Sequence, residues 1–339
     1  MGKFSSKEEP EDVKHLQETT SSIVLSNHSD VSQILRFNKV RQMPIIKWNN
    51  KIGYYMFPSL QSYDYFKNND KEIILNEDGV GIPLFYFEPC QYTTYNADNA
   101  SEKINYQLYI FVMQRADDPP PFEYESIEVS NEYFKLYKCL YAIISKTVKW
   151  FKTIFKMTLR EARERPYHFI YKNYKLDVMM DDYVIRWADT YNMFKDTGYK
   201  SYVVPLDQKS LFDSADDFKS DTPYSNRELI LKKRRETEKE APEPMIYPFD
   251  THDVKEVSTI KDSKNFIGRY TLEGAGGFSN KMAIVYVGEY GPLNSFGICN
   301  IPSTTKLLAC QAFLLHRIEV EKQQERNRNA YRGASGLYF

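Results

Sequence analysis

The 339-residue chain has little of what the familiar metal and disulfide chemistries need. Its four cysteines form no Cys-x-x-Cys pair, and their scatter fits reduced thiols in a cytosolic protein better than a disulfide framework. No two of its five histidines stand at metal-ligand spacing, so we expect no metal and no other cofactor. No apolar run reaches the roughly 18 residues that span a bilayer, and the mean hydropathy is -0.57.

The chain also has no excess of basic or of acidic residues. The chain has 45 Lys and Arg against 46 Asp and Glu, a formal net charge of -1, which disfavours nucleic-acid binding by bulk charge. Catalytic signatures such as G-x-S-x-G, H-E-x-x-H and the kinase motifs are absent from the sequence. The adjacent acids Asp181-Asp182 and Asp216-Asp217 would diverge on a helix. We therefore expect a protein that is not an enzyme.

Aromatic residues are abundant. They make up 15% of the chain, with 27 Tyr and 21 Phe against 14 Gly, and hydrophobic residues reach 42%. Such a composition supports a sizeable core. Tyrosine also buries a large area while keeping a polar hydroxyl, so it is frequent at interfaces. We therefore expect self-association, as a homodimer or a larger assembly.

Strands are expected in two regions and a helix at the end. Residues 45–110 combine β-branched and aromatic runs with turn residues, which predicts strands. Residues 266–272 and 282–287 predict two more strands, joined through the glycine-rich segment 274–277 as a hairpin turn. A final helix is expected from Ser303-Thr304, after Pro302, to about Arg328.

The strongest periodic signal predicts a basic amphipathic helix over 134–165. Seven apolar residues alternate steps of three and four: Phe134, Tyr137, Tyr141, Ile144, Val148, Phe151 and Phe155. Lysines fill the other faces, and Lys138, Lys149 and Lys156 are the candidates to face RNA or lipid headgroups. An ordinary solvated lysine face is the competing interpretation. A second helix is expected over 176–196.

The amino terminus begins Met1-Gly2-Lys3-Phe4-Ser5-Ser6, which fits the N-myristoylation pattern with Gly2 as the acceptor. It resembles the termini of the neuronal calcium-sensor family, but no EF-hand loop follows. Acidic residues between 8 and 12 would repel an anionic membrane, so a lipidated Gly2 and a plain acidic arm both stay open.

A short motif resembles a viral family. Tyr290 is followed by Gly291, Pro292, Leu293 and then Phe296, which is similar to the Pro-Gly-Pro-Leu and nearby Phe of partitivirus capsid proteins. Tyr290 departs from the first Pro of that pattern. The resemblance implies a virion component made in the host cytoplasm: a capsid subunit that assembles an icosahedral shell around double-stranded RNA, without sequence specificity.

The resulting hypothesis is a helix-rich α+β, capsid-like shell domain with an inserted protruding region. The expected divisions are a flexible arm (1–28), a helix-rich shell region (29–205), a charged excursion or protrusion (206–262) and a second shell region with helix and tail (263–339). The alternative is an N-myristoylated peripheral membrane protein such as a viral matrix protein. It draws on Gly2, the basic helix and the proline run 119–122.

Overall fold

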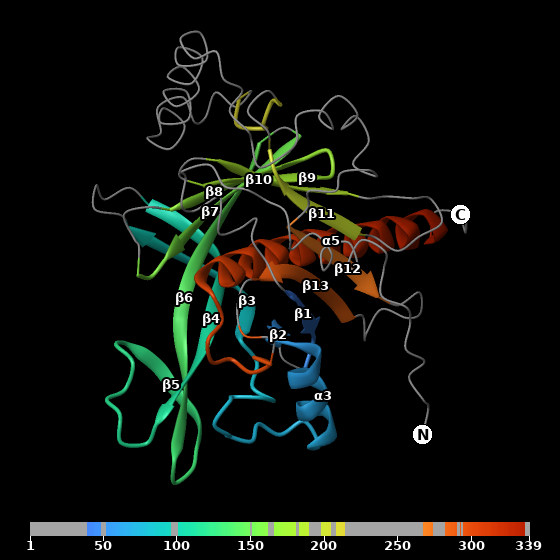
Figure 1. Ribbon diagram of the computed structural model, residues 1–339. Helices are drawn as coiled ribbons and strands as arrows, with labels where there is room; N and C mark the ends of the chain where they lie inside the picture. The colour runs from blue at the N-terminus through green and yellow to red at the C-terminus, as the bar shows by residue number, and fades with distance from the viewer. Residues whose placement is uncertain are drawn as a thin grey trace, which may run out of the picture.

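The computed structural model describes residues 39–48, 52–95, 101–149, 151–161, 166–180, 183–189, 198–204, 208–213, 267–273, 282–289, 292 and 294–335. The strands are β1 (Lys39–Ile46), β2 (Tyr54–Met56), β3 (Phe85–Tyr95), β4 (Ser101–Arg115), β5 (Tyr124–Ser130), β6 (Phe134–Lys149), β7 (Lys152–Leu159), β8 (Tyr167–Lys172), β9 (Lys175–Met179), β10 (Val184–Asp189), β11 (Gly198–Val203), β12 (Gly268–Glu273) and β13 (Met282–Glu289). The two helices among these residues are α3 (Leu60–Asn68) and α5 (Ser303–Ser335) (Figure 1).

The strands form one antiparallel sheet that closes on itself. Its order is β4-β3-β2-β1-β13-β12-β11-β10-β9-β8-β7-β6-β5, and an additional pairing of β4 with β6 joins its two ends. Twelve strands therefore form a closed barrel, while β5 is attached outside the ring to β6. The length of β6 permits this, because its first part pairs with β5 and its last part with β7.

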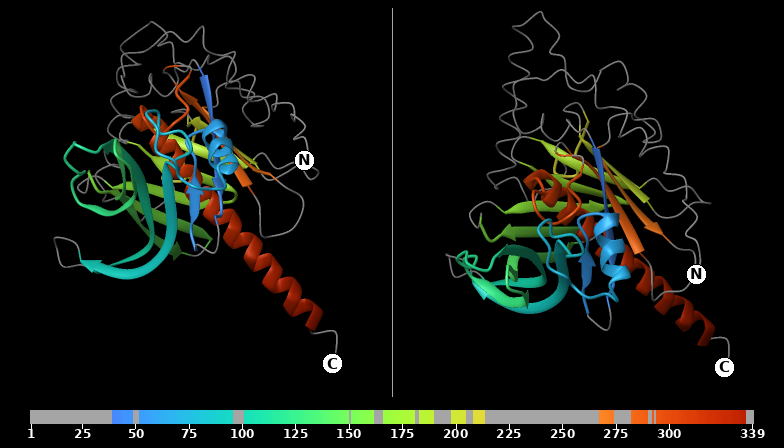
Figure 2. Two further views of the ribbon diagram at one scale, coloured as in Figure 1. Left: turned by 90° about the horizontal axis from the view of Figure 1, so that it is seen from below. Right: turned by 60° about the horizontal axis from the view of Figure 1, so that its bottom comes forward.

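Helix α5 runs through the inside of this barrel. Figures 1 and 2 show it between strands on all sides, with its C-terminal part projecting beyond them. Every residue from Leu308 to His316 is buried, so no face of this part of the helix meets solvent. A helix that is buried all round belongs to a protein core. The barrel is therefore filled by its own last helix.

Contacts from opposite sides of the ring hold α5 in place. Phe313 stacks on Phe87 of β3, with ring centroids 5.5 Å apart. In β10, six places further round the ring of twelve, Trp187 donates a 2.8 Å hydrogen bond from Nε1 to Oε1 of Gln311. Because β3 and β10 face each other across the barrel, these two contacts fix the helix between opposite walls.

Tyrosines of the wall form hydrogen bonds with polar side chains of α5. The hydroxyl of Tyr199 in β11 donates a 2.5 Å hydrogen bond to Glu319, and Nζ of Lys322 lies 2.6 Å from the same carboxylate. Lys322 also contacts the hydroxyl of Tyr171 in β8. Burial, followed by the charge of Glu319, raises the pKa of Tyr199 far above its usual range. The phenol therefore stays protonated and keeps donating.

Helix α3 packs on the outside of the barrel. It begins at the N-cap Ser59, whose hydroxyl accepts a 3.0 Å hydrogen bond from the backbone N–H of Ser62. Its buried Phe66 meets Trp48 edge to face, with centroids 4.8 Å apart, and also contacts Phe57. Figure 1 shows α3 beside β1 and β2, so a second apolar layer covers this part of the wall.

The predicted basic helix over 134–165 is wrong. This stretch forms β6, a turn and β7, paired antiparallel from Ala142 with Leu159 to Lys149 with Lys152. Aromatic and β-branched residues dominate it, and such residues favour strands over helices. Phe151, which the helix prediction places in the core, has 86% of its surface exposed. The apparent helical spacing does not describe one buried face.

The helix-rich α+β fold class is wrong for the same reason. The described residues are mostly β, and the helix predicted over 176–196 is replaced by strands β9 and β10 where the structure describes it. Other predictions are confirmed. The strands predicted at 266–272 and 282–287 correspond to the paired β12 and β13, and the last helix begins at Ser303. Strands also lie in 45–110, but the helix α3, which was not predicted, lies among them.

Some predictions fall outside the described residues. These are the arm 1–28 with Gly2, most of the excursion 206–262, and the tail after Ser335. The proposed division of the chain into four regions therefore stays a prediction. Among the described residues, no helix combines the length and apolar character that crossing a membrane requires.

Candidate functional site

A segment of the described surface carries charge of one sign, and we call residues 116–133 the acidic edge. It has no basic residue and six acidic ones: Asp117, Asp118, Glu123, Glu125, Glu128 and Glu132. The segment comprises the loop after β4, strand β5 and the turn into β6. Figure 1 shows β5 at the lower left, away from α5 and the upper strands. The acidic edge is therefore a local feature of one side of a nearly neutral molecule.

Strand β5 has one paired edge and one open edge. Among the described strands it pairs with β6 alone, from Tyr124 opposite Cys139 to Ser130 opposite Lys135. Each of the other twelve described strands has a neighbour on both sides, although the short β2 pairs with only part of β1 and of β3. An open edge presents backbone N–H and C=O groups that can pair with a further strand. β5 is the one described strand with an edge that is open along its whole length, so it is a place where the described sheet can accept another strand.

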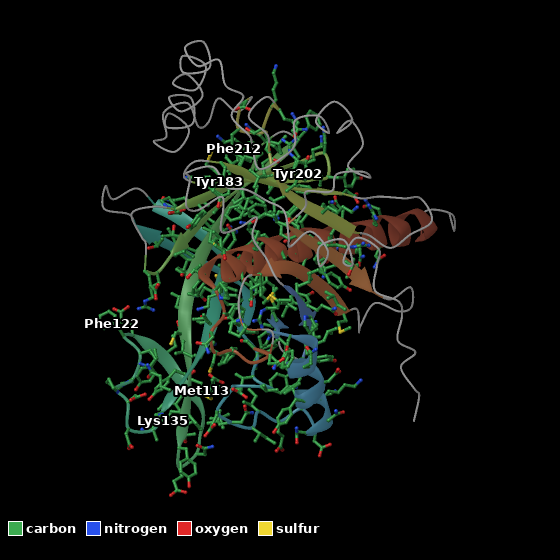
Figure 3. The ribbon with its side chains drawn as sticks, viewed as in Figure 1. Met113, Phe122, Lys135, Tyr183, Tyr202 and Phe212 are labelled. Atoms are coloured by element: carbon green, nitrogen blue, oxygen red, sulfur yellow. The ribbon has the colours of Figure 1, made fainter. Side chains whose placement is uncertain are left out.

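Exposed apolar side chains line the acidic edge. Phe122 is 89% exposed and lies at the margin of the molecule in Figure 3, while Tyr133 is 67% exposed. Ile127 in the middle of β5 is 48% exposed, and Tyr124 at its start is also exposed. These side chains sit beside the carboxylates, so the same strip offers both apolar contact and negative charge.

The ends of the acidic edge are tied to the barrel. The backbone N–H of Ala116 donates a 2.8 Å hydrogen bond to the carbonyl of Tyr133, and Nζ of Lys135 donates to the Ala116 carbonyl, also at 2.8 Å. The side chain of Asn131 accepts hydrogen bonds from the N–H groups of Tyr133 and Phe134 and so shapes the turn. These bonds hold β5 in a defined position against β6.

Two tyrosines and a lysine lie next to β5 on the outer wall. Nζ of Lys138 lies 3.9 Å from the ring centroid of Tyr109 and 5.2 Å from that of Tyr86. Burial, then the charges of Glu125 and Glu88, raises the pKa of Tyr109 well above its usual range. The phenol therefore stays neutral, and the negative charge beside β5 resides on the carboxylates.

Carboxylates next to β5 also affect a tyrosine further along the wall. Burial raises the pKa of Tyr55 to about 12, and the charges of Glu128 and Glu88 add to the shift. In the described part of the chain, no group of three or more His, Cys, Asp or Glu side chains is arranged to hold a metal ion. The acidic edge thus combines negative charge with an open strand edge.

The three lysines predicted to face RNA or lipid do not share a surface of one helix. Lys138 lies in β6 over the two tyrosine rings, and Lys149 ends β6 at the turn into β7. Lys156 in β7 forms a 3.0 Å ion pair with Glu102 of β4. Lys138 is thus engaged beside the acidic edge, while Lys149 is exposed at the β6–β7 turn.

The other predicted site residues are scattered or undescribed. Gly2, Gly291 and Leu293 lie outside the described residues. Pro292 is exposed, and the carbonyl of Phe296 accepts a 2.7 Å hydrogen bond from Ser59 Oγ, which ties this loop to the start of α3. The motif residues that are described therefore serve a local packing contact.

A family model named DIA1 matches residues 38–324, which includes every described strand and nearly all of the described chain. The chain belongs to the DIA1 family. The match spans β1 through most of α5, so the family unit coincides with the filled barrel. No solved structure matches this chain.

Three proteins of the yeast Saccharomyces cerevisiae are similar to this DIA1-family chain. Protein DIA1 is 25% identical over 312 residues, covering 90% of this chain and 86% of its own length. The uncharacterized protein YOR385W is 24% identical, covering 88% of this chain and 93% of its own. A third, the uncharacterized protein YNL165W, is 22% identical and covers 93% and 77% respectively.

Membership of the DIA1 family corrects the viral interpretation. The partitivirus resemblance, the capsid function and the virion location are wrong, because the relatives are cellular yeast proteins and the fold is a filled barrel. The alternative of a myristoylated matrix protein has no support among these relatives either. The Gly-Pro-Leu string at 291–293 was a chance match of a few residues.

The acidic edge was not predicted from the sequence. A signal was present, because six acids and no base in 116–133 are followed by seven bases and no acid in 134–160. This segregation of charge marks the boundary between β5 and β6. What the sequence did not show is that β5 lies outside the closed ring, since that follows from the pairing of β4 with β6.

Proposed function

We propose that this DIA1-family protein is a non-enzymatic binding module that captures an extended, basic segment of another protein along the open edge of β5. The observation that carries the proposal is the open edge itself, because each of the other described strands has a neighbouring strand on both sides for at least part of its length. Addition of a peptide strand to such an edge is a common mode of recognition. This proposal retains the prediction that the protein is not an enzyme.

The charge of the acidic edge selects the partner. The segment 116–133 has six carboxylates and no base; Glu123 already forms an ion pair with Arg160, and the other carboxylates favour lysine or arginine side chains on the added strand. Pairing of β5 with the β5 of a second copy is disfavoured, because it would bring Glu125 and Glu128 close to their counterparts. The exposed Phe122 and Ile127 supply apolar contacts for the alternate side chains of the peptide.

Fluorescence anisotropy with synthetic peptides tests the proposal. A labelled peptide of alternating Lys and Val should bind, and its affinity should fall as salt is added because charge attraction is screened. An alternating Glu and Val peptide should not bind. A peptide in which Pro replaces Val keeps the charge but cannot form the backbone ladder, so it should bind at least about tenfold more weakly, which corresponds to about 1.4 kcal/mol.

Variants locate the binding to β5. The double change Glu125→Lys with Glu128→Lys should weaken binding of the Lys-Val peptide by at least about tenfold. Asp64→Lys with Glu72→Lys makes the same change in net charge on exposed residues in and after α3, and should have little effect. Equal loss in both double variants would show that net charge alone attracts the peptide. Equal binding of the Lys-Val and Lys-Pro peptides would refute strand addition.

A further inference from the structure

The turn between β6 and β7 exposes large apolar side chains. Val148 is 66% exposed and Phe151 is 86% exposed, one on each side of the turn. The two strands are in register up to the pair of Lys149 with Lys152, so these apolar side chains stand at the tip of a hairpin. We call Val148, Lys149, Phe151 and Lys152 the hairpin tip. Exposed Phe and Val side chains grouped in this way are typical of an interaction surface.

The surroundings of the hairpin tip are basic. Residues 134–160 contain six lysines and Arg160 but no acidic residue. Lys149 and Lys152 belong to the tip itself and stand opposite each other in the register. Further from the tip, Lys146 pairs with Glu321 at 2.6 Å and Lys156 pairs with Glu102 at 3.0 Å. Lys149 and Lys152 are the lysines nearest the exposed apolar side chains in the strand register.

The hairpin tip is held firmly by the barrel. The pairing of β6 with β7 runs without a register shift over eight residue pairs, and β6 also pairs with β4 on its other edge. The ion pairs of Lys146 and Lys156 connect the base of the hairpin to α5 and β4. A tip on such a base presents its apolar side chains without rearrangement of the fold.

We propose that the hairpin tip docks on an anionic lipid surface. Phe151 and Val148 would enter the interface between headgroups and acyl chains, where apolar side chains gain burial. Lys149 and Lys152 would lie at the headgroups, where lysine is attracted to anionic lipid. This inference does not depend on lipidation of Gly2 or on the proposed peptide site, because it uses other residues.

Co-sedimentation with vesicles tests the inference, using full-length protein made in bacteria that lack N-myristoyltransferase. The protein should bind vesicles of phosphatidylcholine with phosphatidylserine and bind pure phosphatidylcholine vesicles much more weakly. Phe151→Ser and the double change Lys149→Glu with Lys152→Glu should each reduce partitioning by about tenfold or more. Because the tip is exposed, these changes should leave the thermal unfolding temperature nearly unchanged.

Matched controls use exposed residues away from the tip. Phe122→Ser removes the other highly exposed phenylalanine, on the acidic edge, and should leave vesicle binding intact. Lys47→Glu with Lys71→Glu reverses two exposed lysines near α3, which Figure 1 places far from β7, and should have a small effect. No binding to the anionic vesicles, or equal loss in the tip and control variants, would overturn the inference. Binding of single-stranded RNA in place of vesicles, abolished by Phe151→Ser, would also overturn it.

Discussion

Nδ1 of His316 in α5 lies 3.0 Å from the hydroxyl oxygen of Tyr270 in β12, so a hydrogen bond joins the central helix to the barrel wall. Tyr54 of β2 packs edge-on against the same imidazole, with ring centroids 4.6 Å apart. The imidazole is buried between these two tyrosines. Its environment therefore excludes the water that would stabilise an imidazolium ion.

This burial predicts a loss of stability in acid. Burial, with a smaller effect of Arg317, lowers the pKa of His316 to about 3. Above about pH 6.5 the imidazole is neutral in both the folded and the unfolded chain, so it adds no pH dependence. As the pH falls below 6.5, His316 becomes protonated in the unfolded chain but stays neutral in the folded chain. The free energy of unfolding should therefore decrease by about 1.4 kcal/mol per pH unit, down to about pH 3.

Urea denaturation at pH 7 and pH 5 measures this dependence. His316→Gln retains a hydrogen-bonding side chain but cannot be protonated, so it should flatten the slope relative to the unmodified protein. His168→Gln, at a half-buried position in β8, serves as the matched control and should leave most of the slope in place. An unchanged slope in His316→Gln would show that another group governs the acid sensitivity.

Removal of a core aromatic side chain from α5 should be strongly destabilising. Phe313 is 1% exposed and packs against Phe85 and Phe87 of β3. Phe313→Ala should lower the free energy of unfolding by about 3–5 kcal/mol, the usual effect of emptying a buried aromatic site. Phe151→Ala, at the exposed hairpin tip, should change it by less than about 0.5 kcal/mol. Urea unfolding followed by circular dichroism compares the two, and similar losses would contradict the filled barrel.

A buried ion pair joins the first described strand to the last. Arg41 of β1 makes two hydrogen bonds of 2.6 and 2.7 Å to the carboxylate of Glu289 in β13, and both side chains are almost fully buried. Arg41→Met leaves that carboxylate buried without its guanidinium, so it should destabilise by about 3–5 kcal/mol. Adding Glu289→Leu to Arg41→Met should recover part of the lost stability, as measured by thermal unfolding. Additive losses in the double variant would argue against direct coupling.

Self-association stays a prediction that light scattering can check. Many of the aromatic residues that suggested it lie in the core, including Tyr55, Tyr86 and Phe313, so they do not themselves form an interface. Exposed aromatic side chains such as Tyr174 and Tyr133 remain as candidates for an interface. Size-exclusion chromatography with light scattering should show dimers or larger species. A monomer that persists at high concentration would refute the prediction.

Local sequence patterns predicted some elements and failed for others for a physical reason. Helix α5 was predictable, because Pro302 and the Ser303-Thr304 start precede a long run of good helix formers. The β6–β7 hairpin was not recognised, because its aromatic residues happen to recur at steps of three and four. Strand propensity should have outweighed that spacing in a segment rich in Ile, Thr, Phe and Tyr.

Pairings between distant residues were beyond the reach of local patterns. β1 pairs with β13 across more than two hundred residues, from Lys39 opposite Glu289 to Ile45 opposite Ala283. The closure by β4 and β6 likewise depends on which edges meet in three dimensions. The acidic composition of 116–133 was visible in the sequence, but the open edge of β5 follows from the closure. The charge of the candidate site could therefore be predicted from the sequence, whereas its open strand edge could not.

The position of α5 has a consequence for how the chain is made. All thirteen described strands leave the ribosome before α5 (Ser303–Ser335). The helix that fills the barrel therefore emerges after the strands that form the barrel wall. Strand β1 must also wait for β13, its partner more than two hundred residues later in the chain. Until α5 emerges, the growing polypeptide carries an unfinished wall with exposed apolar residues, and such surfaces are prone to aggregation. The fold is therefore completed only after α5 has left the ribosome, and chaperones that shield nascent chains should be needed until then.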